Sequence, residues 1–377
     1  MAYILKHFDT PLFKFNALAD SSGNEAEIVW VNEEKKELLP LDLKLTPEGL
    51  DRWIRRRAIP QNRAYVHAFL AKCGLSINRP MNIISVCKGL SLTDCYWVVA
   101  DGFEGAYAKY NLYDNSLSRI LAYVAFTGIG SNIRSSLASS PEFTTNGMLP
   151  KCWRRIKGKV LLYKGGTSGA SNTGNEPYCE YYAAQVAKAM GVNAIAYHLS
   201  KWKGNLCSTC ELFTSKDYSF MPVGNIVTSG GFPAVENYHN KLVNVYTDAL
   251  HNMLMFDAII CNTDRHYGNF GFLVDNHTNK IVAPAPLFDH GNALFNLAGG
   301  DEWDNADNLE KYIASLMPRV YDDFIGTARN VMTASNQEQL RHLLKFTFKR
   351  HPRHNLPAKR LKMIEQQIQK RARLLLK

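Results

Sequence analysis

The stretch Asn262-Thr-Asp264-Arg265-His266-Tyr-Gly-Asn269-Phe270 is the most informative part of the sequence, because it places polar side chains directly between two apolar elements. The segment before it, from Leu242 to Ile260, predicts an apolar helix. Polar groups packed between apolar elements lower stability unless they have partners or a task. A second polar motif, Phe288-Asp289-His290-Gly-Asn292, follows Asn269 by about twenty residues. We expect the two motifs to form one functional site.

These residue types are the ones that phosphoryl transfer requires: a carboxylate to orient the attacking hydroxyl, oxygen ligands for Mg²⁺, and a cation on the phosphates. Asp264 supplies the first, Asn269 and Asp289 the second, and Lys164, in an apolar strand, the third. Each element alone is common, so the prediction depends on their order along the chain, which is the order found in kinases. The alternative is a buried polar network with turn residues and no catalysis.

The motifs resemble those of the HipA-like serine/threonine kinases, with closer similarity to the bacterial CtkA-type branch. The resembling stretch runs from about Thr144 to Asp289. The resemblance implies ATP and Mg²⁺ as cofactors and Asp264 as the catalytic, hydroxyl-orienting group. It also implies that Asn269 and Asp289 hold magnesium and that Lys164 contacts the nucleotide phosphates.

The resemblance also assigns the partner of the lysine and the hinge. A helix rich in Ala and Val looks like the helix that presents a glutamate to Lys164 in the family. Glu180 is the expected glutamate, and Glu176 is the alternative, because residues four apart share a helix face. Glu211-Leu-Phe213 is similar to the hinge strand of the family, whose backbone binds the edge of the adenine.

The segment Thr144-Thr145-Asn-Gly147-Met148 resembles the phosphate-side loop of the family, in which Gly147 allows close approach of the backbone. The autophosphorylated serine of the family falls on Thr144, with Thr145 adjacent, so these two are the phosphoacceptor candidates. A phosphate there adds about two negative charges beside the nucleotide and is expected to eject the loop.

Two features leave alternatives open. The tract from Gly165 to Gly174 follows Lys164 and does not match a kinase Gly-x-Gly-x-x-Gly, so it is either a phosphate loop or a flexible linker. His266 is grouped with the cofactor-binding residues, either as a scaffold that bonds backbone or as a proton carrier. We prefer the scaffold role, because Asp264 already fills the role of base.

The sequence predicts an α+β, two-lobed, protein-kinase-like fold of HipA-like type, with a β-containing N-lobe and a mostly helical C-lobe. Residues 1–130 are expected to form an accessory region, 131–215 the N-lobe with the lysine and hinge, and 216–377 the C-lobe. The elements predicted around the site and in the accessory region are a strand that starts near Glu27 and ends in the charged turn Glu33-Glu34-Lys35-Lys36, a helix starting at Thr46-Pro47, a helix over 61–72, a strand over 159–164 and a helix ending before Gly191.

Length and composition bound the class of protein. A chain of 377 residues with 46% hydrophobic and 21% charged residues fits two or three packed units of an ordinary globular protein. The sequence contains no run of roughly 18 consecutive apolar residues, so it predicts no membrane span. The N-terminus lacks a signal-peptide pattern, so we expect a cytoplasmic, bacterial protein, or an effector secreted without a cleaved signal. Cys207-Ser-Thr-Cys210 has zinc spacing, but no second ligand pair follows.

The C-terminal segment accounts for all of the net charge of +10, and the rest of the chain is close to neutral. Between Arg341 and Lys377 the chain carries twelve basic residues and one acidic residue, Glu365. Such a helical face predicts contact with nucleic acid or an acidic partner. The alternative is an ordinary solvated face of a basic protein.

Three functions remain open at this point. The first is an autophosphorylating serine/threonine kinase that acts on protein, with a toxin-like or effector role and an antitoxin-like regulatory partner. The second is a phosphoinositide or small-molecule kinase, since Asp-Arg-His-x-x-Asn also resembles the loop of phosphoinositide kinases. The third is a binding module for nucleic acid or a partner on a weakly active kinase fold. Lys164, Asp264, Asn269 and Asp289 together favour an enzyme, because a binding module has no need of all four.

Overall fold

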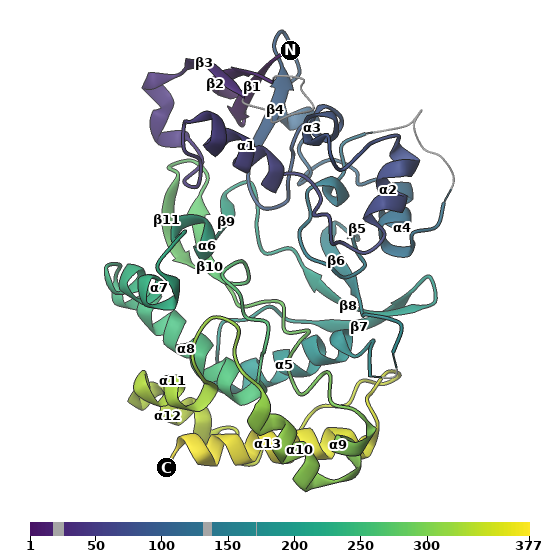
Figure 1. The fold of residues 1–377 in the computed structure, drawn as a ribbon, viewed down its shortest axis with the longest axis vertical. Helices are drawn as coiled ribbons and strands as arrows, with labels where there is room; N and C mark the ends of the chain where they lie inside the picture. The colour runs from purple at the N-terminus through teal and green to yellow at the C-terminus, as the bar shows by residue number, and fades with distance from the viewer. Residues whose placement is uncertain (18–25, 131–137, 171) are drawn as a thin grey trace. The chain divides into compact units, whose positions relative to one another are not determined.

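The computed structural model describes residues 1–17, 26–130, 138–170 and 172–377. The first seven residues of the predicted N-lobe, 131–137, and Ser171 in the glycine-rich tract lie outside the described residues. The chain divides into two compact units (Figure 1). The first comprises Met1–Lys164, Leu212–Met221 and Leu273–Val282, and the second comprises Gly165–Glu211, Pro222–Phe272 and Ala283–Lys377. The domain boundaries expected after residues 130 and 215 stay a prediction.

The first unit opens with a four-stranded antiparallel sheet of order β3-β2-β1-β4. Side chains of β1 alternate between buried and half-buried, so one face of the strand lies in a core with Trp53 and Ile54. The strand predicted from Glu27 to the charged turn at Glu33 is confirmed as β3, and a 3₁₀ helix over Glu33–Leu38 follows it. The strands are β1 (Ala2–His7), β2 (Thr10–Asn16), β3 (Glu27–Val31) and β4 (Tyr96–Ala100).

The described residues of the first unit form four α-helices. The predicted start of α1 is confirmed, because the Thr46 side chain accepts a hydrogen bond from Gly49 N at 3.1 Å and Pro47 is the first helical residue. Helix α2 ends at Gly74 as predicted, but it begins later than expected, because Tyr65 adopts a left-handed conformation with φ 63°. The helices are α1 (Pro47–Arg56), α2 (Val66–Cys73), α3 (Pro80–Cys87) and α4 (Arg119–Thr127).

A hairpin in the first unit carries the predicted nucleotide lysine. Strands β5 (Lys151–Ile156) and β6 (Lys159–Gly165) pair antiparallel across the turn Lys157-Gly158, both of whose residues have positive φ. In this register Lys151 stands opposite Lys164. The strand predicted over 159–164 is confirmed.

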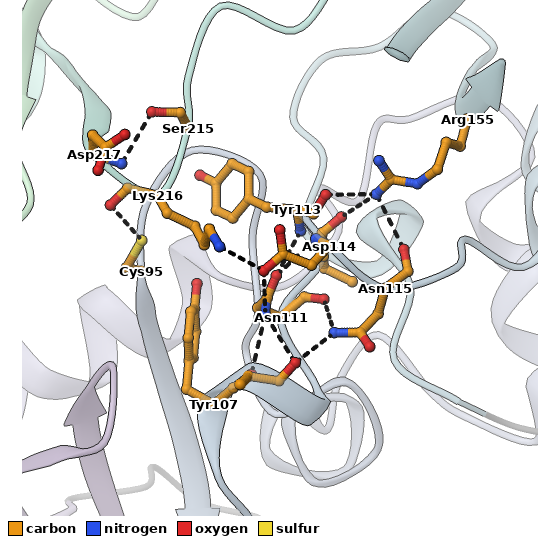
Figure 2. Close-up of polar contacts among 12 residues, drawn as sticks. Cys95, Tyr107, Asn111, Tyr113, Asp114, Asn115, Arg155, Ser215, Lys216 and Asp217 are labelled. Carbon is orange, nitrogen blue, oxygen red and sulfur yellow. Dashed lines mark hydrogen bonds and ion pairs between the residues drawn. The ribbon is translucent and has the colours of Figure 1, made fainter. Parts of the chain in front are cut away.

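A polar network joins the segment after β4 to this hairpin within the first unit (Figure 2). The Asn111 amide donates to Tyr107 O at 3.3 Å and accepts from Asp114 N at 2.9 Å, which closes a compact turn. Arg155 of β5 donates to the carbonyls of Tyr113 at 2.7 Å and of Leu112 and Asn115. Part of the predicted accessory region is therefore hydrogen-bonded to the strand that pairs with β6.

A three-stranded sheet of order β11-β10-β9 gathers strands that are distant in the sequence. It consists of β9 (Tyr218–Pro222), β10 (Gly271–Asp275) and β11 (Lys280–Pro284). Strand β10 starts directly after Phe270, so this sheet determines where the first polar motif ends.

The second unit is mostly helical, with one antiparallel hairpin, β7 (His198–Trp202) and β8 (Asn205–Glu211). Helix α8 (Asn244–Ile260) is buried on every side from Met253 onward, as expected for a helix that is apolar all round. Helix α5 (Glu176–Met190) ends at Gly191 with φ 71°, as predicted. The remaining helices are α6 (Val223–Ile226), α7 (Gly231–Asn240), α9 (Gly300–Asp304), α10 (Ala306–Ser315), α11 (Phe324–Asn330), α12 (Ala334–Arg341) and α13 (Ala358–Leu375).

The predicted α+β, two-lobed fold class is confirmed by this arrangement of strands and helices. Among the described residues, no helix is both long and apolar enough to cross a membrane.

Candidate active site

The first polar motif forms a tight loop between α8 and β10 in the second unit. Helix α8 ends at Ile260, and the loop begins at Cys261, whose backbone is left-handed with φ 50°. Inside the loop, Asp264 N donates to Asn262 Oδ1 at 3.2 Å, and Asn269 N donates to His266 O at 2.9 Å. The loop is therefore held by its own hydrogen bonds, and its side chains are fixed relative to α8.

Arg265 joins the two polar motifs. Its side chain is completely buried and binds both carboxylate oxygens of Asp257 on α8, each at 2.9 Å. The same guanidinium donates to Phe288 O at 2.7 Å and contacts His290 Nδ1 at 3.2 Å. Burial lowers the pKa of Arg265, but the charge and hydrogen bonds of Asp257 outweigh it and raise the pKa above its usual value. A permanently charged side chain therefore holds the loop of Asp264 against the loop of Asp289.

Both carboxylate oxygens of Asp264 have a hydrogen-bond partner. Asn292 Nδ2 donates to Asp264 Oδ2 at 3.3 Å, and Arg319 binds Asp264 Oδ1. The backbone of Asn292 is fixed, because its main-chain carbonyl accepts hydrogen bonds from Thr263 N and Thr263 Oγ1, both at 3.2 Å. The side chain of Asp264 keeps 27% of its surface exposed, so an incoming hydroxyl can reach it.

Asn269 and Asp289 carry oxygen donors of the type expected of magnesium ligands. The amide nitrogen of Asn269 donates to Asp264 O at 3.4 Å, which leaves the amide oxygen as a ligand. Asp289 is left-handed with φ 58°, and its N–H donates to Tyr197 Oη at 3.1 Å. Burial raises the pKa of Tyr197 well above 10, so this hydroxyl is neutral. A carboxylate and an amide oxygen match the hard ligands that Mg²⁺ prefers.

His266 supports the loop through the backbone. Its Nδ1 accepts a hydrogen bond from Gly268 N at 3.0 Å, so the proton of the neutral ring lies on Nε2. Burial lowers the pKa of His266, and the nearby charges of Asp264 and Asp289 offset this only in part. The ring is therefore neutral near pH 7.

The two candidate glutamates of α5 have different partners in the second unit. Glu180 is fully buried and accepts a hydrogen bond from Ser208 Oγ of β8. Glu176 accepts from Thr167 Oγ1 at 2.6 Å and from Thr167 N at 3.2 Å. Gly174 N also donates to Thr167 Oγ1, at 3.3 Å. Part of the glycine-rich tract is thus tied to the start of α5 and is not a free linker there.

In the first unit, Lys164 has a buried neighbour that the sequence reasoning did not single out. Lys164 is 6% exposed, and its cross-strand partner Lys151 is 5% exposed. Lys151 Nζ donates to Asn146 O at 2.8 Å, and a Cβ atom at Gly147 would lie 2.2 Å from this nitrogen. A signal was available in the sequence, because Lys151 begins a strand directly after the loop that contains Gly147.

The loop that contains Gly147 is anchored by Arg63, which the sequence reasoning also missed. This guanidinium is buried and donates to three carbonyls, those of Lys151 at 2.6 Å, Thr145 at 3.1 Å and Glu142 at 3.2 Å. The next residue along the chain, Ala64, donates its N–H to Met148 O at 2.7 Å. Burial lowers the pKa of Arg63 to about 10, so the side chain stays charged.

Both phosphoacceptor candidates are half-buried, and their hydroxyls are engaged. Thr144 Oγ1 donates to Leu90 O at 2.9 Å. Thr145 Oγ1 donates to Pro141 O at 2.6 Å and accepts from Trp153 Nε1 at 2.9 Å. Either hydroxyl must leave its carbonyl before it can accept a phosphate.

The predicted hinge falls where the chain passes from one unit to the other. Glu211 is the last residue of β8 and of its segment of the second unit, and Phe213 belongs to the first unit. In the first unit, Leu212 N donates to Val160 O at 3.0 Å, and the ring of Phe213 lies 5.5 Å from that of Phe220. The adenine-binding role of Glu211 and Phe213 stays a prediction.

The site residues are thus distributed over both units. Asp264, Asn269, Asp289, His266 and Glu180 lie in the second unit, where hydrogen bonds connect the two polar motifs. Glu211 also belongs to the second unit. The first unit holds the other candidates, which are Lys164, Gly147, Thr144, Thr145 and Phe213.

Comparison with known proteins supports a kinase relationship. No protein-family model matches the chain. The serine/threonine-protein kinase CtkA of Helicobacter pylori strain J99 is 27% identical over 135 residues, a match that covers 32% of this chain and 41% of CtkA. The matched part therefore spans less than half the length of that relative.

The likeness in fold to solved structures is carried by HipA. HipA from the toxin–antitoxin system of Shewanella oneidensis MR-1, solved with HipB and operator DNA, is 13% identical with a TM-score of 0.55, and the match covers 99% of this chain and 97% of that one. The proinflammatory kinase CtkA of Helicobacter pylori is 16% identical with a TM-score of 0.48, covering 60% of this chain and 88% of that one. The chain thus resembles the HipA-like serine/threonine kinases, in fold over nearly its whole length and in sequence over 135 residues.

Proposed function

We propose that this protein is an ATP- and Mg²⁺-dependent serine/threonine protein kinase of HipA-like type. The observation that carries the proposal is the placement of Asp264, whose carboxylate is oriented by Asn292 while Arg265 holds its loop against the loop of Asp289. A carboxylate fixed beside two oxygen ligands for a metal is the arrangement that phosphoryl transfer to a hydroxyl needs. The relationship to CtkA, a serine/threonine-protein kinase, supports the same class of reaction.

In this reaction Asp264 orients the acceptor hydroxyl and takes its proton as the oxygen attacks the γ-phosphorus. The bond between the γ-phosphorus and the bridging oxygen breaks, and ADP leaves. Asn269 and Asp289 would hold Mg²⁺, which neutralises charge on the phosphates when it is bound. His266, neutral and bonded to Gly268 N, keeps the loop in shape while Asp264 serves as the base.

The first unit would supply the cations for the nucleotide phosphates. Lys164 is the expected phosphate contact, and Lys151 is the second, because both are buried and face each other across the β5–β6 hairpin. Two ammonium groups on one hairpin attract a phosphate more strongly than one does. Gly147 leaves room beside Lys151 Nζ that any larger residue would fill.

Autophosphorylation of Thr144 or Thr145 is part of the proposal. Each hydroxyl helps to hold the loop in place by donating to a carbonyl, so a phosphate on either one removes a hydrogen bond and adds charge near two lysines. Intact-mass measurement after incubation with ATP and Mg²⁺ tests this. A shift of one phosphate that is lost in Thr144→Val or in Thr145→Val identifies the acceptor, and no shift in the unsubstituted protein rejects autophosphorylation.

The main experiment uses labelled ATP and Mg²⁺ with generic protein and lipid substrates. The unsubstituted protein is compared with Asp264→Ala and Asp289→Ala, and with Asp301→Ala as a control in an exposed acid. Label on protein that only the first two substitutions abolish supports the proposal. Label on lipid supports a phosphoinositide kinase, and no label together with salt-sensitive binding of nucleic acid supports a binding module.

The biological role is proposed from the relatives. A toxin-like or effector role would involve a protein substrate and an antitoxin-like regulatory protein, in the cytoplasm or after secretion. Nucleic acid is a candidate partner of the basic segment from Arg341 to Lys377, which contains α13. Part of the charge on α13 is already paired, since Lys359 binds Asp304 at 3.2 Å and Lys370 binds Glu310 at 2.6 Å. Any such binding should therefore be weaker than the formal charge predicts, and strongly dependent on salt.

A further inference from the structure

Arg319 occupies one oxygen of the carboxylate that orients the acceptor. It lies in the segment between α10 and α11 in the second unit, and its guanidinium binds Asp264 Oδ1. The other oxygen, Oδ2, accepts from Asn292 at 3.3 Å. Both oxygens of Asp264 therefore have a partner before any acceptor hydroxyl arrives.

An acceptor hydroxyl that approaches Asp264 competes with these two partners for the carboxylate oxygens. Asn292 is held through two hydrogen bonds from Thr263 to its carbonyl, so it is fixed to the same loop as Asp264. Arg319 is 54% exposed, and its long side chain comes from a different segment. Exposed ion pairs contribute little to stability, so Arg319 is the partner that gives way.

Displacement leaves the guanidinium without its anion. We propose that Arg319 is a specificity-determining residue, which selects polypeptide acceptors that carry an anionic side chain within one or two residues of the serine or threonine that is phosphorylated. The proposal rests on the protein kinase activity proposed above. The short range follows from geometry, since Arg319 contacts the same carboxylate that receives the hydroxyl and consecutive residues advance by about 3.3–3.6 Å.

The chemistry of the guanidinium favours a carboxylate or a phosphate. Its planar donors bind either group through two parallel hydrogen bonds. An anionic acceptor replaces Asp264 as the partner of Arg319, whereas a neutral acceptor breaks the ion pair between Arg319 and Asp264 without forming a new one. A basic acceptor adds repulsion. Selection therefore comes from the difference between these cases, and not from total binding strength. Asp323, in the same segment, does not replace the substrate anion, because it caps α11 through Gly326 N at 2.5 Å.

The test measures kcat/KM for four serine peptides that differ only in the residue beside the acceptor, which is Asp, phosphoserine, Asn or Lys. The enzymes are the unsubstituted protein, Arg319→Gln, Arg319→Lys and the control Arg55→Gln. Arg55 pairs with Asp51 in α1, and the exposed fractions of that pair, 54% and 27%, equal those of Arg319 and Asp264. The control therefore removes an equivalent exposed ion pair away from Asp264.

We expect the unsubstituted protein to prefer the Asp peptide over the Asn peptide by roughly three- to tenfold, and the phosphoserine peptide by at least as much. Arg319→Gln should bring this ratio to about one, with the Asn peptide phosphorylated faster than before. Arg319→Lys keeps the charge but not the paired donors, so it should keep part of the preference. Arg55→Gln should leave all ratios unchanged.

Two results would overturn the inference and leave the proposed function standing. One is an Arg319→Gln enzyme that is slower on all four peptides by the same factor, which would mean that Arg319 serves the transfer itself. The other is a preference for the Asp peptide over the Asn peptide that is the same in Arg319→Gln as in the unsubstituted protein. Equal thermal unfolding temperatures for the unsubstituted protein and both Arg319 variants exclude misfolding as the cause. Absence of label on every peptide with the unsubstituted protein would instead reject the protein kinase activity, and the inference with it.

Discussion

Arg265 and Asp257 form a two-bonded ion pair in which neither side chain has any exposed surface. Asp257 lies on the last turn of α8, and Arg265 lies in the loop that follows. A buried pair with good geometry is neutral or only slightly favourable compared with an apolar pair, but the loss of one partner leaves an uncompensated charge in the interior. The pair therefore makes the loop of Asp264 dependent on a carboxylate that takes no part in the proposed chemistry.

Asp257→Ala should lower the free energy of unfolding by about 3–5 kcal/mol, because Arg265 stays charged and buried without its partner. Urea unfolding at pH 7 measures this. The control is Asp51→Ala, which breaks the exposed pair with Arg55 and should change stability by about 1 kcal/mol or less. A loss below 1 kcal/mol in Asp257→Ala would show that Arg265 finds another anion.

Arg63 should matter both for stability and for nucleotide binding. Arg63→Met leaves three carbonyls without their donor, so we expect a loss of about 2–4 kcal/mol in the free energy of unfolding. The loop with Gly147 would lose its anchor, so the affinity for MgATP measured by calorimetry should fall as well. Arg52→Met, in an exposed residue of α1, serves as the control. Unchanged MgATP affinity in a folded Arg63→Met protein would separate this loop from nucleotide binding.

The two polar motifs were predictable because each is short, continuous and bounded by apolar elements. Asp264, Asn269 and Asp289 lie in these motifs, and the helix before them has an unambiguous apolar pattern. The starts and ends of α1 and α5 were predictable for a similar reason, since Thr46, Pro47 and Gly191 are local signals. Chemistry that is encoded within a few neighbouring residues can be found in the sequence.

Arg63 and Arg319 were not predictable, because their partners are distant along the chain. Arg63 contacts carbonyls 79 to 88 residues away, and Arg319 binds a carboxylate 55 residues away. Arg63 precedes α2 in a turn with no apolar periodicity, and nothing local distinguishes either arginine from an ordinary surface residue. Contacts of this kind depend on tertiary packing, which a single sequence does not display.

His7 makes the first unit sensitive to mild acid. It is 3% exposed and packs against Tyr96 with ring centres 4.6 Å apart. Burial lowers the pKa of His7 to about 4, an effect that Asp94 opposes and His277 reinforces. Because the folded pKa lies below the unfolded value of about 6.5, the fold favours the neutral ring, and stability is lost as the pH falls from 6.5 towards 4.

The full loss attributable to His7 is about 3 kcal/mol at pH 4 and below. The free energy of unfolding, measured with urea at pH 7.5 and at pH 5, should differ less between the two pH values in His7→Gln than in the unsubstituted protein. His67→Gln, in an exposed residue of α2, should leave the difference as it was. An identical pH dependence in His7→Gln would mean that water or a carboxylate reaches the ring.

Gly147→Ala should disturb the proposed phosphate site through two separate effects. The first is the backbone, because φ is +95° and an alanine there is strained by about 1–2 kcal/mol. The second is contact, because the new Cβ would lie 2.2 Å from Lys151 Nζ and would push this ammonium off Asn146 O. Gly158→Ala separates the two, since Gly158 has φ +83° and no atom within 4 Å of a Cβ atom. Both variants should lose similar stability, but only Gly147→Ala should weaken MgATP binding, by about tenfold or more if the displaced Lys151 contact contributes about 1.5–3 kcal/mol. Equal MgATP affinity in the two variants would remove Lys151 from the nucleotide site and leave Lys164 as its proposed cation.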